Sequence, residues 1–132
     1  MSNQHKLNLK ELLSGIVDAP PIEFNDICDD SRLVNKEDIF FALKGIESHG
    51  CDFIDKVINS NAAAVIYEPP YEFTQSDATI PIIPIDNLRS LLGEIANRYY
   101  DYPSKSMNII GVTGTNGKTT VAWLIKSCLN NM

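Results

Sequence analysis

A glycine-rich loop toward the carboxyl end of the chain carries residue types that bind phosphate. The stretch "IIGVTGTNGKTT", residues 109–120, reads as a hydrophobic strand followed by a loop that closes on Gly117, Lys118 and Thr119. The general phosphate-binding loop is G-x-x-x-x-G-K-[ST], and here Val112 stands where its first glycine would be. A strand leading in and a helix leading out are the context that this motif requires. The stretch therefore predicts a site for a nucleoside triphosphate; the alternative is a glycine-containing turn without a ligand.

The polar groups of this loop have separate predicted roles. Amides at the start of a helix can turn together toward an anion, where the helix dipole favours negative charge. We expect Lys118 to reach the β- and γ-phosphates and to assist catalysis, and the Thr119 hydroxyl to bind Mg²⁺. The predicted nucleotide-binding residues are Gly114, Thr115, Asn116, Gly117, Lys118, Thr119 and Thr120.

Composition narrows the class of protein. The chain has 132 residues, of which 44% are hydrophobic and 21% charged, as in ordinary globular domains. Its net charge is −6 and its 11 Lys and Arg residues are scattered, which argues against nucleic-acid binding. No apolar run approaches the ~20 residues that span a bilayer, and the first residues do not resemble a secretory signal. We expect a cytoplasmic protein without membrane insertion.

Three cysteines, Cys28, Cys51 and Cys128, lie far apart in the sequence. None belongs to a Cys-x-x-Cys pair, so a metal or redox centre is not indicated. We expect free, buried thiols.

The elements that would position the loop alternate between helix and strand. Asn8 and Glu11 suggest a capped helix that ends near Gly15, and Asp52 suggests the N-cap of a second helix. A regular apolar stripe predicts a third helix over residues 86–100. Strands are predicted at 38–43, 62–68, 80–85 and 107–113, and a last helix at 118–131. The prolines of the third strand restrict it to an edge or an end.

This alternation predicts an α/β fold made of two parts. Residues 1–103 would form a small N-terminal α/β domain with a mixed or mostly parallel sheet. Residues 104–132 would be the first strand, phosphate loop and helix of a P-loop domain. One such unit cannot bury both faces of its strand, so we expect this second domain to be truncated.

Two stretches resemble the Mur ligases, which add amino acids to the peptidoglycan precursor. The loop "GTNGKTT" is similar to their ATP loop, and the Pro-Ser segment before its strand resembles the MurE type. Upstream, Asp30-Ser31-Arg32, "FFALKG" and "HGCDFI" resemble the N-terminal domain of MurE and MurF ligases. Together the two matches cover most of residues 29–128.

The resemblance implies a uridine site in the N-terminal domain. The residues it implies for binding this substrate are Asp29, Ser31, Ile46, Glu47 and Ser48. Two neighbours have alternative roles. Arg32 either pairs with the substrate's diphosphate or forms a local salt bridge with Asp29 or Asp30, and we favour the salt bridge. His49 is expected to have a structural or solvent role, since the family's chemistry occurs in other domains.

The resemblance also implies an activity for the full-length parent. It would be an ATP-dependent, Mg²⁺-assisted amide ligase that adds meso-diaminopimelate or L-lysine to UDP-N-acetylmuramoyl-L-alanyl-D-glutamate through an acyl phosphate. We expect a monomer, and we expect the 132 residues alone to be inactive. Alternatives are a MurF-type ligase, a folylpolyglutamate synthase, or a stand-alone module that binds a nucleotide or UDP-sugar.

Overall fold

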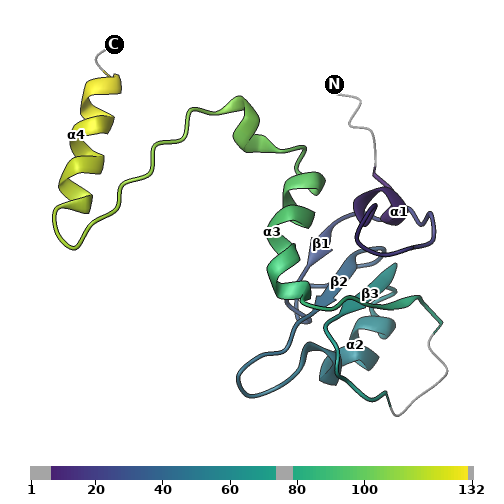
Figure 1. Cartoon of the computed structure of the whole chain (residues 1–132). Coiled ribbons are helices and arrows are strands. Elements are labelled where there is room, and N and C mark those ends of the chain that lie inside the picture. The colour runs from purple at the N-terminus through teal and green to yellow at the C-terminus, as the bar shows by residue number, and fades with distance from the viewer. Residues whose placement is uncertain (1–6, 74–78, 131–132) are drawn as a thin grey trace. The chain divides into compact units, whose positions relative to one another are not determined.

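A computed structural model describes residues 7–73 and 79–130 of the chain. The chain divides into two compact units, residues 1–101 and 102–132 (Figure 1). We describe each unit by itself.

The first unit is built on a four-stranded sheet. Its strands are β1 (Ile27–Cys28), β2 (Ile39–Ala42), β3 (Ala64–Tyr67) and β4 (Ile82–Pro84), and they lie in the order β1-β2-β3-β4. Every neighbouring pair is parallel. The α/β prediction is therefore confirmed, and the proline-containing strand β4 lies at an edge as expected. The two-residue strand β1 was not predicted, because two residues are too short to show alternation.

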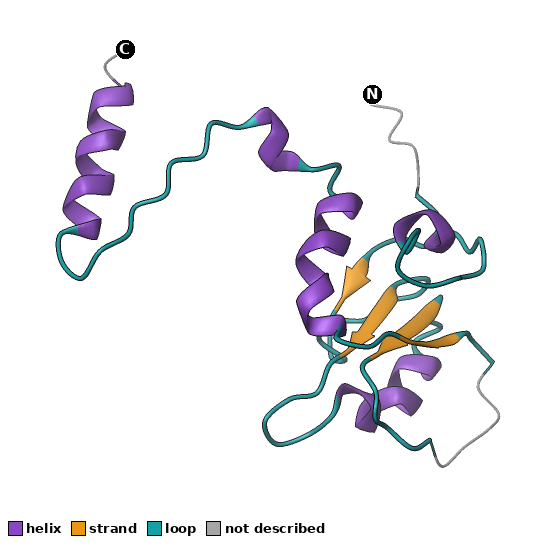
Figure 2. Ribbon diagram, in the orientation of Figure 1, coloured by secondary structure: helices purple, strands orange, loops and turns teal. Residues whose placement is uncertain are grey.

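Helices cover both faces of this sheet (Figure 2). Helices α1 (Leu9–Leu12) and α3 (Leu88–Tyr99) pack on one face. Helix α2 (Ile54–Asn59), preceded by the 3₁₀ helix η1 (Gly50–Phe53), packs on the other. Alternate residues of β2 serve the two faces: Ile39 and Phe41 join the core under α1 and α3, and Phe40 and Ala42 join the core under α2. Strand β2 is apolar and buried at every position because both of its faces are covered.

The predicted N-terminal cap of α1 and the stripe of α3 are confirmed, whereas α1 ends at Leu12, before the predicted end near Gly15. The Asn8 side chain accepts from the Glu11 N–H at 3.0 Å and the Glu11 carboxylate accepts from the Asn8 N–H at 3.1 Å, so both bonds of a capping box are present. Arg98 of α3 donates to the Leu12 and Ser14 carbonyl oxygens, at 3.2 and 2.6 Å. This guanidinium binds carbonyl groups at the end of α1 and joins the two helices of one face.

The cysteines are free, as predicted, but only one is fully buried. Cys51 has no exposed surface, and burial raises the pKa of its thiol to about 12. Cys28 is half-buried and Cys128 is exposed. The expectation of three buried thiols is therefore wrong for Cys128, which lies in the second unit.

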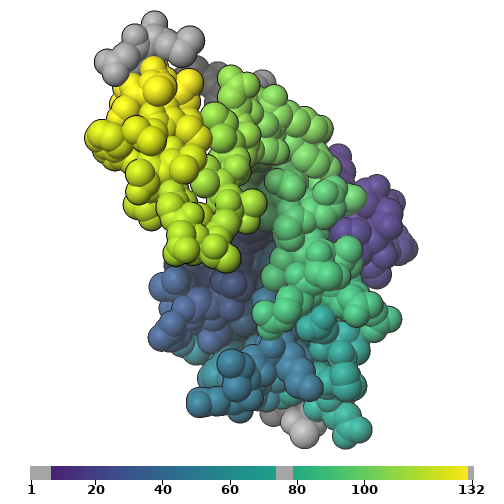
Figure 3. Space-filling model, turned by 60° about the vertical axis from the view of Figure 1, so that its left-hand side comes forward, coloured from purple at the N-terminus to yellow at the C-terminus, as the bar shows by residue number. Residues whose placement is uncertain are grey.

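The second unit contains the predicted helix but not the predicted strand. Helix α4 spans Lys118–Asn130, and a 3₁₀ helix, η2, spans Pro103–Ser106. Residues 107–113 form no strand, and the Ile109 and Ile110 side chains are 69% and 57% exposed. A strand needs a hydrogen-bonded neighbour, and the described part of this unit provides none. In Figure 3 the side chains of α4, in yellow, lie at the surface.

Among the described residues, no helix has both the length and the hydrophobicity needed to span a membrane.

Two glycines give a matched test of the packing. A Cβ on Gly50 would lie 2.6 Å from Ala42 Cα and 2.9 Å from Leu43 N, both backbone atoms of the β2 end, whereas a Cβ on Gly93 of α3 would meet nothing within 4 Å. We expect Gly50→Ala to lower the free energy of unfolding by about 1–3 kcal/mol through overpacking. Gly93→Ala should raise it by roughly 0.5–1 kcal/mol through helix propensity. Urea unfolding followed by circular dichroism measures both, and equal effects would contradict the predicted clash.

Candidate functional site

The loops that follow β1 and β2 border a pocket of about 580 Å³ on the first unit. Because parallel strands end at one edge of a sheet, the residues after β1 and β2 come together there, which is where ligands bind in open α/β sheets. Phe53 and Lys56, from the segment that ends in α2, complete the lining, and Figure 3 shows this part of the chain in shades of blue. The lining residues are Asp29, Asp30, Ser31, Arg32, Phe40, Leu43, Gly45, Ser48, Gly50, Phe53 and Lys56.

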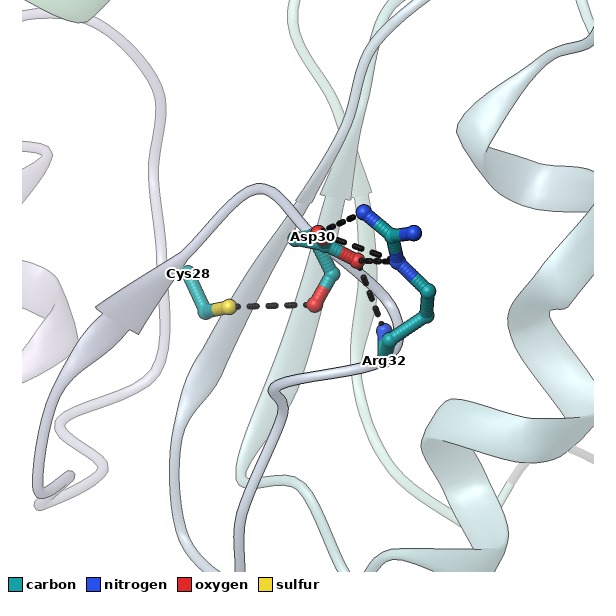
Figure 4. A network of polar contacts seen from close by, with 3 residues as sticks. All are labelled: Cys28, Asp30 and Arg32. Carbon is teal, nitrogen blue, oxygen red and sulfur yellow. Dashed lines mark hydrogen bonds and ion pairs between the residues drawn. The ribbon is translucent and has the colours of Figure 1, made fainter.

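The loop after β1 is fixed by a short network around Asp30 (Figure 4). The Arg32 guanidinium donates from Nε to Oδ1 at 2.9 Å and from Nη2 to Oδ2 at 2.6 Å, and the Arg32 backbone N–H donates to Oδ1 at 2.9 Å. The Cys28 thiol donates to the Asp30 carbonyl oxygen at 3.2 Å. Hydrogen bonds from Arg32 lower the pKa of Asp30 to about 2. The local salt bridge expected for Arg32 is therefore confirmed, and its partner is Asp30.

The loop after β2 is a closed turn. The Gly45 N–H donates to the Ser48 carbonyl oxygen at 2.8 Å, and the Gly50 N–H donates to the Leu43 carbonyl oxygen at 2.8 Å. Of the three loop residues implied for substrate binding, Ser48 lines the pocket, whereas Ile46 and Glu47 are outside its lining. Ile46 is fully exposed. The structure therefore brings together Asp29, Ser31 and Ser48 and leaves Ile46 and Glu47 apart from them.

His49 holds this turn in place through both ring nitrogens. Nδ1 accepts from the Cys51 N–H at 3.1 Å, and Nε2 lies 3.1 Å from the Glu68 carbonyl oxygen. A carbonyl only accepts, so Nε2 carries the proton and the ring is neutral. The His49 N–H in turn donates to the Asp52 carboxylate at 2.7 Å. The structural role expected for His49 is confirmed.

The same geometry corrects the predicted cap. Asp52 was predicted as the N-cap of the second helix, but His49 is the N-cap of η1 and Asp52 is its third residue. Phe53 precedes α2 without a side-chain cap. Sequence reasoning missed this because histidine is not among the usual N-cap residues, although its Nδ1 can accept from a backbone amide.

Six lining residues were missed by the sequence analysis, and three of them are Phe40, Phe53 and Lys56. Phe40 lies in β2 and is almost completely buried, whereas Phe53 is 44% exposed beside the pocket. Lys56 follows three residues after Phe53 and also lines the pocket. Residues three apart on a helix share a face, which is the signal that would have found this pair.

The loop predicted to bind phosphate lies in the second unit, and two of its glycines have positive φ angles. Gly117 has φ +75° and Gly114 φ +147°, values that favour glycine. The Lys118 ammonium donates to the Gly114 carbonyl oxygen at 2.6 Å and so spans the loop. Helix α4 starts at Lys118, and the Thr115–Thr120 stretch is exposed.

Thr119, the residue predicted to bind Mg²⁺, is exposed near the start of α4. It is the second residue of α4, and Mg²⁺ at phosphate sites keeps several waters and few protein ligands. Across residues 7–73 and 79–130, His, Cys, Asp and Glu side chains form no group of three that would hold a metal by itself. A metal ion at this loop would therefore need the phosphates of a bound nucleotide.

The fold and the pocket define an α/β protein with a site at the carboxyl edge of a parallel sheet. A family model described as "Mur ligase family, catalytic domain" matches residues 23–100, which include the whole pocket and end before the phosphate loop. The chain belongs to the Mur ligase family.

Curated relatives share much of this chain's sequence. The UDP-N-acetylmuramoyl-L-alanyl-D-glutamate–2,6-diaminopimelate ligase of Coxiella burnetii is 43% identical over 102 residues, which cover 77% of this chain and 21% of that protein. The protein of the same name from Chlamydia caviae is 43% identical over 129 residues, covering 92% and 25%. The chain thus spans about a quarter of the length of the relatives it matches.

Solved structures show the same fold. A UDP-N-acetylmuramoylalanyl-D-glutamyl-2,6-diaminopimelate–D-alanyl-D-alanyl ligase from Acinetobacter baumannii has a TM-score of 0.60 and 29% identity, and the match covers 87% of this chain and 24% of that one. The MurF ligase from Thermotoga maritima, solved in complex with ADP, has a TM-score of 0.55 and 31% identity over 73% and 21%.

The Asp30–Arg32 pair gives a direct titration test. In the native protein the Asp30 carboxyl should titrate near pH 2, below its ordinary value of 3.8. In Arg32→Gln its pKa should rise toward 3.8, because the donated hydrogen bonds are lost. A depressed carboxyl pKa adds stability above pH 3.8 that is lost as the pH falls through about 2.

Carboxyl ¹³C shifts followed by NMR between pH 1.5 and 6 give both pKa values. Lys36→Gln is the control, since Lys36 pairs with Glu37 and not with Asp30. An Asp30 pKa that is the same in the native protein and in Arg32→Gln would contradict the assignment.

Proposed function

We propose that this chain supplies the uridine pocket and the ATP phosphate loop of a ligase that joins diaminopimelate to UDP-N-acetylmuramoyl-L-alanyl-D-glutamate in peptidoglycan synthesis. The observation that carries the proposal is the pocket at the carboxyl edge of the sheet. Asp29, Ser31 and Ser48, implied for substrate by the resemblance, all line it. The diaminopimelate ligases that are 36–43% identical to the chain support this substrate.

The lining chemistry suits a uracil nucleotide. The Ser31 and Ser48 hydroxyls can each donate or accept, which matches the carbonyls and N–H of uracil. Phe53, which is 44% exposed, adds apolar surface for a planar base. Ile46 and Glu47 stay predictions as substrate contacts, since they lie beside the pocket on its loop and not in its lining.

The phosphate loop would serve the activation step. The substrate carboxylate attacks the γ-phosphorus of ATP, giving an acyl phosphate and ADP, and the amine of the incoming amino acid then displaces phosphate to form the amide. Lys118 and the amides of residues 114–120 would neutralise and orient the phosphates, and Thr119 would hold Mg²⁺. Bound Mg²⁺ supplies additional charge neutralisation to the transferring phosphoryl group.

The choice between related activities rests on the comparisons. Diaminopimelate is favoured over L-lysine because it is the amino acid in the names of the relatives. A MurF-type activity is the second candidate, because the solved structures with this fold carry that name. Dipeptide and tripeptide forms of the UDP-sugar distinguish the two. We further infer a monomer in the cytoplasm, where ATP and UDP-sugars are available.

Binding of the UDP-sugar tests the proposal directly. Isothermal titration calorimetry of the 132-residue chain with UDP-N-acetylmuramoyl-L-alanyl-D-glutamate should show one site. Ser31→Ala should weaken it roughly 3- to 10-fold through a lost hydrogen bond. Ser90→Ala should leave the affinity unchanged, since Ser90 bonds the Asn87 carbonyl and does not line the pocket. A native chain that binds no uridine compound would overturn the proposal.

The phosphate loop has its own test. Lys118→Ala should reduce affinity for Mg·ATP at least tenfold, because an ammonium that bonds phosphate oxygens is lost. Lys126→Ala, in the same exposed helix, should change it little. Fluorescence titration with a labelled ATP analogue measures both, and equal effects of the two substitutions would show that the loop does not grip the nucleotide.

A further inference from the structure

We propose that Lys56 binds the diphosphate of the uridine nucleotide, and that Arg32, the other cation of the pocket, does not. The inference rests on the proposed uridine function and adds a specificity-determining residue to it. It comes from the distribution of charge in the pocket, which the sequence alone did not show.

Arg32 is already occupied. Its Nε and Nη2 face both oxygens of Asp30 at 2.6–3.2 Å, and its backbone N–H bonds the same carboxylate. If the guanidinium turned to a phosphate, the Asp30 carboxylate would lose its partner beside a second carboxylate, Asp29. Strong charge-assisted hydrogen bonds to Asp30 would be lost in exchange for similar bonds to phosphate, so the exchange gains little.

Lys56 lines the same pocket from α2 on the opposite wall. Its side chain is exposed, and within residues 7–73 and 79–130 its ammonium makes no salt bridge. Its positive charge also contributes to lowering the pKa of Asp30, as expected for two residues that line one pocket. Lys56 therefore offers three donors that no described side chain uses.

The charge balance of the pocket requires such a cation. Asp29 and Asp30 carry two negative charges and Arg32 and Lys56 carry two positive charges, so the lining is neutral overall. The diphosphate of a UDP-sugar would add about two further negative charges to a lining that includes Asp29, and like charges repel. Lys56 is positioned to offset them, because a compact ammonium attracts phosphate as a point charge.

The uridine end and the phosphate end are separable along the pocket. Ser31 and Ser48 provide neutral hydrogen bonds, whereas Lys56 stands three residues beyond the aromatic ring of Phe53 on the η1–α2 segment. A base resting against Phe53 would therefore have its phosphates within reach of Lys56. This arrangement predicts that Lys56 recognises phosphate and leaves recognition of the nucleoside to the other residues.

The experiment compares three probes on four proteins. Uridine, UMP and UDP are titrated by calorimetry or by NMR into the native chain, Lys56→Gln, Lys56→Arg and the control Lys44→Gln. Lys44 is exposed on the loop after β2 but does not line the pocket. In the native chain UDP should bind roughly tenfold more tightly than uridine, and the difference should shrink with added salt.

Lys56→Gln should lose most of this gain and keep its affinity for uridine. Lys56→Arg should retain most of it, and Lys44→Gln all of it. Thermal unfolding verifies that each variant is folded. If Lys56→Gln does not fold, Lys56→Arg still tests the inference.

Three other outcomes would each overturn the inference. An unchanged UDP gain in Lys56→Gln would overturn this inference and leave the uridine site standing. An equal loss for uridine and UDP would overturn it as well, since Lys56 would then act on the nucleoside. Failure of the native chain to bind any of the three probes would overturn both this inference and the proposed function.

Discussion

The contact between Gly50 and the end of β2 is the constraint on which the pocket depends. Gly50 lies so close to the Ala42 and Leu43 backbone that a side chain there would clash, and its N–H bonds the Leu43 carbonyl oxygen. The chain therefore returns to the sheet immediately after the turn at residues 45–48. This return sets the start of η1, and with it the direction in which α2 leaves. Phe53 and Lys56 face the β1 loop as a consequence.

Polar groups in and around this pocket divide into those that hold the backbone and those left for a ligand. Asp30 and Arg32 bind each other, and His49 uses both ring nitrogens on backbone groups. Ser31, Ser48 and Lys56 line the pocket without such a task in the described contacts. Fixing the first set removes conformational freedom before a ligand arrives, so that less binding energy is lost to ordering the loops.

The two units differ in whether their extended segments have hydrogen-bonding partners. In the second unit α4 forms because its hydrogen bonds are internal to the helix, while residues 107–113 form no strand because a strand needs a partner. The apolar side chains of Ile109, Ile110 and Leu124 are exposed for the same reason. In the first unit every strand has a neighbour and both faces are covered, so the sheet is complete enough to shape a pocket.

The sequence by itself determined the local and periodic features. It predicted the α/β class, the capping box at Asn8, strands β2 and β3, the edge strand β4 and the stripe of α3, because each depends on spacing within a short stretch. The motif residues of the phosphate loop and the Asp30-Ser31-Arg32 segment were visible for the same reason. Only the tertiary structure decided that His49 replaces Asp52 as a cap, that Arg32 pairs with Asp30 and not with Asp29, and that Lys56 faces them from α2. The place of Lys56 depends on which loops the parallel sheet brings together at one edge, and the other two choices depend on how the backbone of one loop turns. No local sequence pattern records either.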